Sequence, residues 1–205
     1  MLHISARKRL YAFLSSLFAY PDGELLKQLA AANLEELVIL LPGSSPHPKP
    51  AAKNLLEELQ IGFTSLCINR LGGAPAPPYG SVYLEESGRL AGLTTMAVAA
   101  AYRAEGLAVE GSPEPADYLA TELEFLYFLI QQEEAALTRR DIPAARLATG
   151  KQSSFFFNYL HPWVGEFCRR VIADEQSPEL YRWGASLLQR FVELEQRWLE
   201  KHAPA

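Results

Sequence analysis

The chain has 205 residues, 49% of them hydrophobic and 21% charged, with a formal net charge of -5. This length suits one domain with a sizeable core, because a chain of this size buries roughly 70% of its unfolded surface on folding. The composition argues against disordered, collagen-like and coiled-coil classes. The acidic balance and the lack of a long Lys/Arg block also argue against nucleic acid as a partner, since binding a phosphate backbone takes clustered cations.

The first twenty residues superficially resemble a secretory signal, because Arg7-Lys8-Arg9 precedes the apolar run Leu10 to Ala19. Ser15 and Ser16 interrupt that run, and its large apolar side chains recur at helical spacing. We therefore expect an amphipathic first helix rather than a cleaved signal. No later stretch approaches the ~20 apolar residues of a membrane span, so no integral membrane segment is expected.

Helical patterns, and the residues that end or cap helices, account for most of the chain. Prolines, glycines and capping residues predict helices that end before Pro21, then run from Asp22 to Ala31, Asn33 to Leu41, Ala51 to Ile68, Thr94 to Glu105, Pro115 to about Thr138, Asp141 to near Leu160, Pro162 onward, and Ser177-Pro178-Glu179 to Lys201. Loops are expected at Pro42 to Pro50, Leu71 to Tyr79 and Leu107 to Pro113.

The expected fold class is all-α. The longest segment with strand periodicity is Ser81 to Leu84, which is too short to argue for a sheet. We predict a single globular helical bundle with a long Pro/Gly-rich central loop, forming one domain over residues 1–205. The sequence leaves the oligomeric state open, a homodimer included.

Signatures of catalysis and of metal binding are missing. The four histidines lack the spacing that puts two ligands on one helix face, and Gly72-Gly73 lacks the Lys-Ser/Thr of a phosphate-binding loop. No G-x-S-x-G occurs, and neither Cys67 nor Cys168 has a nearby histidine as its base. We expect no enzyme activity, no metal and no cofactor. Two cysteines without a C-x-x-C also favour a reducing compartment.

Paired carboxylates occur at Glu57/Glu58, Glu85/Glu86, Glu122/Glu124 and Glu133/Glu134. On helices such pairs are usually solvated, and we expect this of the first and last pairs. Glu85/Glu86 adjoins the central loop. The aromatic run Phe155-Phe156-Phe157 is expected in the core, with an apolar groove as the alternative.

Three ordered segments resemble the redox-enzyme maturation chaperones of the TorD/DmsD/NarJ type. They are Pro77-Pro78-Tyr79-Gly80-Ser81-Val82-Tyr83-Leu84, then Glu114-Pro115-Ala116-Asp117-Tyr118 with Glu122-Leu123 and Phe125-Leu126, then Leu160-His161-Pro162-Trp163 with Phe167. The loop motif is most similar to that of DmsD-like leader-binding proteins. One departure is Tyr118, which stands where the family usually has a histidine and lacks a group that titrates near neutrality.

The resemblance implies a cytoplasmic protein that binds the twin-arginine signal peptide of a molybdenum-cofactor oxidoreductase and its catalytic subunit. It would assist cofactor insertion and hold back export until maturation. A receptor for two guanidinium groups followed by an apolar stretch needs carboxylates beside an apolar groove. The residues expected to supply this site are Tyr79, Ser81, Tyr83, Leu84, Glu114, Pro115, Asp117, Tyr118, Pro162 and Trp163.

Several of these residues also have a structural interpretation. Asp117 can stabilise the first turn of its own helix through backbone N–H groups, Tyr79 and Tyr83 can anchor the loop, and Trp163 can be a buried indole after a helix start at Pro162. Two other function classes remain open. One is a permanent helical accessory subunit of a respiratory oxidoreductase, and the other is a helical enzyme with a pocket of perturbed titratable groups.

Overall fold

The structure is a computed structural model that describes residues 3–30, 33–48, 54–85, 92–107 and 113–204. Within these ranges the regular elements are all helical, and one isolated antiparallel bridge is the only strand-like pairing. In chain order they are α1 Ile4–Phe18, α2 Gly23–Ala30, α3 Asn33–Ile39, α4 Leu55–Phe63, the π-helical turn η1 Thr64–Ile68, α5 Gly80–Leu84, α6 Leu93–Ala104, α7 Leu119–Thr138, α8 Ile142–Phe155, the π-helical turn η2 Phe156–Leu160, α9 His161–Ala173 and α10 Glu179–His202. The predicted all-α fold class is confirmed.

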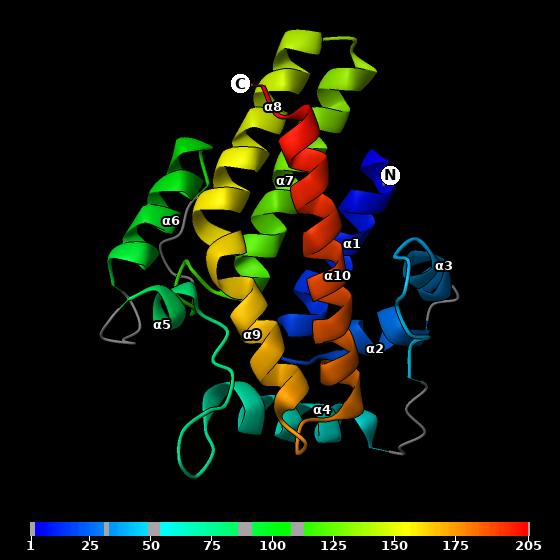
Figure 1. Cartoon of the computed structure of the whole chain (residues 1–205), viewed down its shortest axis with the longest axis vertical. Helices are drawn as coiled ribbons and strands as arrows, with labels where there is room; N and C mark the ends of the chain where they lie inside the picture. Colours follow the sequence, from blue (N-terminus) through cyan, green and yellow to red (C-terminus); the bar gives the residue numbers. More distant parts are fainter. Residues whose placement is uncertain (1–2, 31–32, 49–53, 86–91, 108–112, 205) are drawn as a thin grey trace.

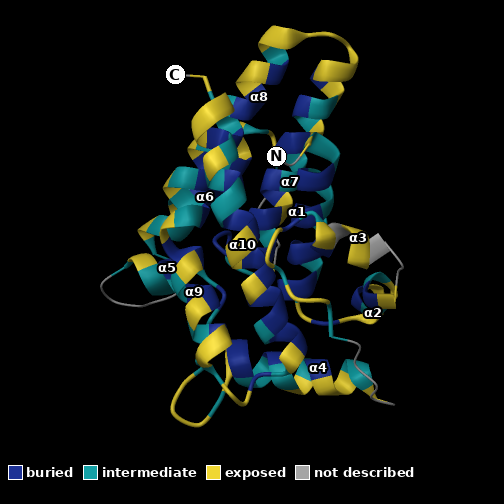
Figure 2. Cartoon of the chain, turned by 45° about the vertical axis from the view of Figure 1, so that its right-hand side comes forward, coloured by how far each residue is buried: buried dark blue, intermediate teal, exposed yellow. Residues whose placement is uncertain are grey.

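The long helices form the body of the molecule (Figure 1). α1 packs against α7 and α10, α7 packs against α8, and α10 packs against α9. The short α5 and α6 lie on one flank of this bundle, α2 and α3 lie on the other, and α4 crosses one end. Buried residues follow the inner faces of α1, α7 and α10 (Figure 2), so these three helices contain much of the core.

The first helix is a core element, as its amphipathic spacing predicts. Leu10, Leu14 and Leu17 are completely buried, and each contributes about 1.5–3 kcal/mol by leaving water. α1 approaches α10 closely at Gly184, where an added methyl group would collide with the Leu17 side chain. The helix ends at Phe18, before Pro21.

A buried charged cluster joins α1 to three other helices. The Arg7 guanidinium is completely buried and donates from Nε and Nη2 to the Glu195 carboxylate, at 2.8 and 2.6 Å. Nη2 also donates to Gln152 Oε1 at 2.7 Å, Nη1 lies 3.4 Å from Glu133 Oε2, and the guanidinium carbon lies 3.6 Å from the centre of the Trp198 ring. The expectation that Glu133 is solvated is therefore wrong, because this carboxylate is needed inside the bundle beside a buried cation.

One expected helix boundary and one local pattern differ from the structure. α7 begins at Leu119 rather than at Pro115, because Tyr118 is extended and pairs with Tyr79. The segment Ser81 to Leu84, which has strand periodicity, belongs to the short helix α5. In both cases a tertiary contact between distant segments outweighs the local pattern.

Pro162 lies in the first turn of α9, as expected, but no break in the helical backbone precedes it. The backbone stays helical from Ile142 to Ala173, and η2 is a widened turn in which the His161 N–H donates to the Phe156 carbonyl. A widened turn relieves the clash between a proline ring and the carbonyl of the preceding turn. The predicted break near Leu160 is therefore a π-helical turn inside one long helix.

Several local signals act as expected. Asp22 Oδ1 accepts hydrogen bonds from the first N–H groups of α2, and Asp141 Oδ1 accepts one from Ala144 at the start of α8. The central loop follows η1 and contains Gly72 and Gly73 with φ of 95° and 102°, a backbone conformation that favours glycine. Phe155 and Phe156 are buried in the core, as the aromatic run predicts.

Candidate functional site

The three segments that resemble redox-enzyme maturation chaperones meet on one flank of the bundle, around α5. Tyr79 and Tyr118 form an antiparallel bridge, in which the Gly80 N–H donates to the Asp117 carbonyl at 2.9 Å and the Leu119 N–H donates to the Pro78 carbonyl at 2.8 Å. Two segments almost 40 residues apart in sequence are thereby held side by side. α5 also packs against α9, which brings the third segment to the same place.

Asp117 is completely buried beneath this junction. Its Oδ2 accepts a hydrogen bond from the Ser81 N–H at 2.7 Å, and its Oδ1 accepts one from Thr95 Oγ1 at 2.7 Å. The carboxylate thus caps α5, whose first N–H groups have no helical partner, and ties α5 to α6. The interpretation that Asp117 stabilises the first turn of its own helix is wrong, because α7 begins two residues later and the carboxylate points to α5.

The two tyrosines of the bridge have different environments. The Tyr79 hydroxyl donates to Glu114 Oε2 at 2.7 Å, and burial followed by this carboxylate raises the pKa of Tyr79. Tyr118 is buried and its hydroxyl donates to the Phe18 carbonyl at 2.9 Å, at the end of α1. Tyr118 is therefore a structural anchor between α1 and the bridge, whereas Tyr79 and Glu114 remain partly exposed.

An aromatic stack lies on the other side of α5. The Tyr83 ring is stacked on Trp163, with 5.3 Å between the ring centroids. The Arg170 guanidinium also lies over the Tyr83 ring, 4.7 Å from its centroid. Gly80 approaches the same indole so closely that an added Cβ would lie 3.0 Å from Trp163 Nε1. Trp163 is buried, as the structural interpretation of this residue predicts.

Several apolar side chains reach the outer surface of this region. Leu84 is 39% exposed and Pro162 is exposed, while Pro115 is half-buried next to Glu114. α6 packs beside α5 and exposes Leu93 and Met96, at 79% and 65%. The surface around α5 therefore combines aliphatic side chains with the partly exposed Glu114 carboxylate.

One buried carboxylate was not among the expected site residues. Glu122 in α7 is completely buried, and its Oε2 accepts a hydrogen bond from Trp163 Nε1 at 3.3 Å. Burial, followed by the nearby Asp117 charge, raises the pKa of Glu122 well above its ordinary range. Its helical spacing with Leu119 and Leu126, both buried, is the signal that it faces the core. Glu124, two residues on, is exposed.

The other paired carboxylates differ in their environments. Glu85 Oε1 accepts a hydrogen bond from the Thr94 N–H at 2.9 Å and so caps α6, which leaves it a structural role at the edge of the region. Glu86 lies outside the described residues. Glu57 and Glu58 are exposed on α4, as expected of a solvated pair.

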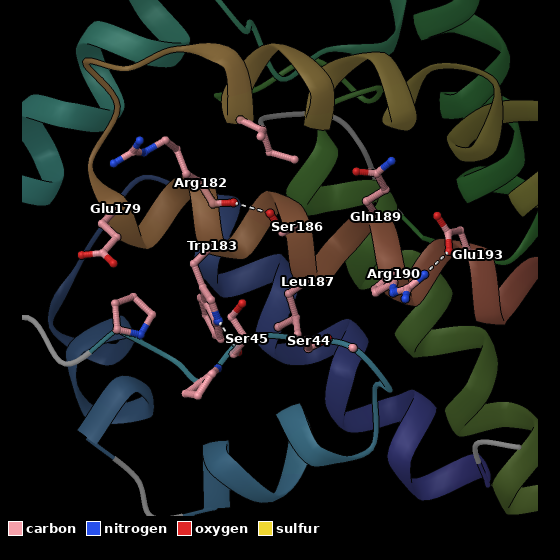
Figure 3. Close-up of a pocket in the computed structure, with 14 residues that line it drawn as sticks. Ser44, Ser45, Glu179, Arg182, Trp183, Ser186, Leu187, Gln189, Arg190 and Glu193 are labelled. Atoms are coloured by element: carbon pink, nitrogen blue, oxygen red, sulfur yellow. Dashed lines mark hydrogen bonds and ion pairs between the residues drawn. The ribbon is translucent and has the colours of Figure 1, made fainter.

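A separate open groove of about 690 Å³ lies along α10, beside the loop after α3 (Figure 3). Trp183 packs at its base and donates from Nε1 to the Ser45 carbonyl at 3.0 Å. Two arginines and two glutamates line the groove, and none of the residues singled out in the sequence does. The lining residues are Gly43, Ser44, Ser45, Pro46, Pro48, Ile172, Glu179, Arg182, Trp183, Ser186, Leu187, Gln189, Arg190 and Glu193.

In the described parts of the chain, no group of three or more His, Cys, Asp or Glu side chains is arranged to hold a metal ion. Among the described helices, none combines the length and apolar character needed to cross a bilayer.

Comparison with known proteins identifies the family. The family model described as nitrate reductase delta subunit matches residues 21–169, which is more than half of the chain. The chain is 29% identical to the chaperone protein TorD of Shewanella loihica, covering 93% of this chain and 91% of that protein, and 29% identical to TorD of Vibrio parahaemolyticus, covering 94% of each.

A solved structure agrees with this match. It is a protein of Archaeoglobus fulgidus assigned by inference to redox enzyme maturation, with 25% identity, a TM-score of 0.51, and coverage of 98% of this chain and 96% of that one. The matched range 21–169 contains all three segments that surround α5. The chain therefore belongs to the nitrate reductase delta subunit family and is a chaperone of the TorD/NarJ type.

Proposed function

We propose that this chaperone binds the twin-arginine signal peptide and the apo form of a molybdenum-cofactor oxidoreductase, assists cofactor insertion and delays export until the enzyme is mature. The observation that carries the proposal is the convergence of three distant motif segments around α5, where carboxylates lie beside aromatic and aliphatic side chains. A twin-arginine peptide offers two guanidinium groups and then an apolar stretch. The guanidinium groups complement the carboxylates, and the apolar stretch complements the aromatic and aliphatic side chains.

The ten expected site residues divide into a contact surface and its support. Glu114, positioned by the Tyr79 hydroxyl, is the accessible carboxylate for the first guanidinium. Leu84, Tyr83 and the neighbouring prolines Pro115 and Pro162 supply the apolar contacts. Asp117, Ser81, Tyr118 and Trp163 support this surface by fixing α5 and the bridge.

The proposed location is the cytoplasm, because a signal peptide must be bound before export. The proposed role is binding without catalysis, in keeping with the names of the TorD relatives. A chaperone with this role dissociates from its client once the client is mature, whereas a permanent accessory subunit stays bound. Copurification of this protein with the mature enzyme at constant stoichiometry would favour the accessory-subunit function instead.

The test is calorimetric titration with a synthetic peptide that contains Ser-Arg-Arg followed by an apolar stretch. Replacing Glu114 by Gln should lower the affinity about 10- to 100-fold, since a hydrogen bond to a charged group contributes about 1.5–3 kcal/mol. Replacing both peptide arginines by lysines should also weaken binding, because lysine cannot form the bidentate pair.

The matched control is Glu57→Gln, an exposed glutamate on α4, which removes the same charge at a distance from α5. It should leave the affinity within a factor of two. Raising the salt concentration should weaken binding only in part, because salt screens exposed charge pairs but not apolar burial. Equal affinity for the Arg-Arg and Lys-Lys peptides, or complete salt insensitivity, would contradict recognition by carboxylates.

A further inference from the structure

The Glu122 carboxylate is only half satisfied in the core. Its Oε2 accepts a hydrogen bond from Trp163, but its buried Oε1 has no hydrogen-bond partner among the described residues. Such groups are rare in folded proteins, because an unpaired buried polar atom costs about 1–3 kcal/mol. The buried hydroxyls of Ser81 and Tyr83, both on α5, also lack partners within the described parts of the chain. Three unpaired polar groups therefore belong to the α5 region and the carboxylate behind it.

α5 is a cover rather than a core element. It has five residues, too few to be stable as an isolated helix. Its contacts to the bundle include the Ser81 N–H bond to Asp117, the stacking of Tyr83 on Trp163, and the packing of Gly80 against the same indole. The atom nearest to a Cβ placed on Gly80 is thus Trp163 Nε1, the same nitrogen that donates to Glu122 Oε2. Movement of α5 away from Trp163 would open the route to Glu122.

We propose that Glu122 is a second carboxylate of the signal-peptide site, covered by α5 in the free protein, and that it pairs with a guanidinium of the twin-arginine motif when α5 shifts. This inference rests on the proposed function. A guanidinium supplies the donors that Oε1 lacks, lies between two carboxylates if it enters beside Asp117, and can stack on the Trp163 indole. The sequence placed Glu122 among the paired carboxylates and in the second chaperone-like segment, but not among the expected site residues.

If a guanidinium binds at Glu122, the Glu122 carboxyl should lose its proton. Burial and the Asp117 charge raise its pKa, so the proposal has Glu122 protonated in the free protein and ionised when it pairs with a guanidinium. The other titratable groups that face it are Asp117 before α7 and Tyr102 on α6, with Tyr83 on α5 and Arg170 on α9 beyond the indole. Burial raises the pKa of both tyrosines, which keeps them neutral throughout.

The experiment is calorimetry with the same Arg-Arg peptide at pH 7 in phosphate and in Tris, two buffers with different ionisation enthalpies. Wild-type protein should release protons when it binds the peptide, and its affinity should rise with pH. Glu122→Gln should keep the hydrogen bond from Trp163, bind about tenfold more weakly and release no proton. The control Glu124→Gln removes the same charge from the exposed side of α7, and it should leave proton release unchanged.

The outcomes separate this inference from the proposed function. If wild-type protein does not bind the peptide, the proposed function fails. If it binds without proton release, or if Glu122→Gln binds and releases a proton like wild type, the role of Glu122 is refuted while the proposed function stands. Should Glu122→Gln fail to fold, backbone amide exchange of the wild type decides. Exchange across residues 80–84 should rise on peptide binding, and increased protection there would refute the shift of α5.

Discussion

Replacing Arg7 by Leu should strongly destabilise the fold. The substitution removes the cation that pairs with Glu195 and Glu133, and it leaves two carboxylates in the core. Breaking a buried ion pair from one side costs about 3–5 kcal/mol, because the remaining charge stays desolvated. For a domain of this size each kcal/mol lowers the Tm by about 2–4 °C, so the expected fall is about 6–20 °C.

The assay is denaturant and thermal unfolding followed by circular dichroism, for Arg7→Leu, Glu195→Leu and the double variant. The double variant should recover much of the loss, because apolar side chains of similar volume can replace a buried pair at little cost. The control is Lys8→Leu on the same helix, which breaks a partly exposed pair with Glu134 and should cost less than about 1 kcal/mol. Losses in the two single variants that simply add, or a loss below about 1 kcal/mol for Arg7→Leu, would refute the reasoning.

Other substitutions and conditions test the packing and the pKa shifts. Gly184→Ala should destabilise by about 1–3 kcal/mol in thermal unfolding, because the new methyl group collides with α1; an unchanged Tm would show that the contact adjusts freely. Hydrogen bonds from Arg70 lower the pKa of Asp174 to about 2, so this pair contributes about 1–2 kcal/mol that is present above pH 4 and lost as the pH falls toward 2. Asp174→Asn should remove this part of the acid dependence, and an identical pH profile would contradict it. Burial raises the pKa of Cys67 and Cys168, so a thiol reagent should modify both only on unfolding; fast modification of the native protein would show that the core opens readily.

Much of the architecture could be predicted because the local signals are strong. Asp22, Asp141 and Gly106 mark helix ends through side-chain caps or a positive φ, and these interactions involve residues close in sequence. The start of α7 could not be predicted in this way. Pro115 is a good first helical residue, but the bridge to Tyr79 keeps the backbone extended as far as Tyr118, and no local pattern carries that pairing.

The candidate site shows the same division. Residue types and order identified the segments that meet at α5, but not which side chains face outward. Asp117 and Trp163 are buried and support α5, whereas Glu114 and Leu84 are partly exposed. The carboxylate of Glu133 was expected in water, because the sequence does not show that Arg7 lies beside it. Burial of a charge depends on a partner more than 100 residues away, which pattern reasoning cannot locate.

The Arg7–Glu195 pair also constrains how the chain is assembled on the ribosome. The two residues are 188 positions apart, so α1 is synthesised long before its partner on α10 exists. At about 5–20 residues per second, translation takes about 10–40 s to cover that distance. In the interval α7 can dock on α1 and provide Glu133, but the guanidinium lacks its bidentate acceptor until the final helix is made. This cluster is therefore completed only after α10 has been synthesised, and the nascent chain must tolerate an incompletely neutralised cation until then.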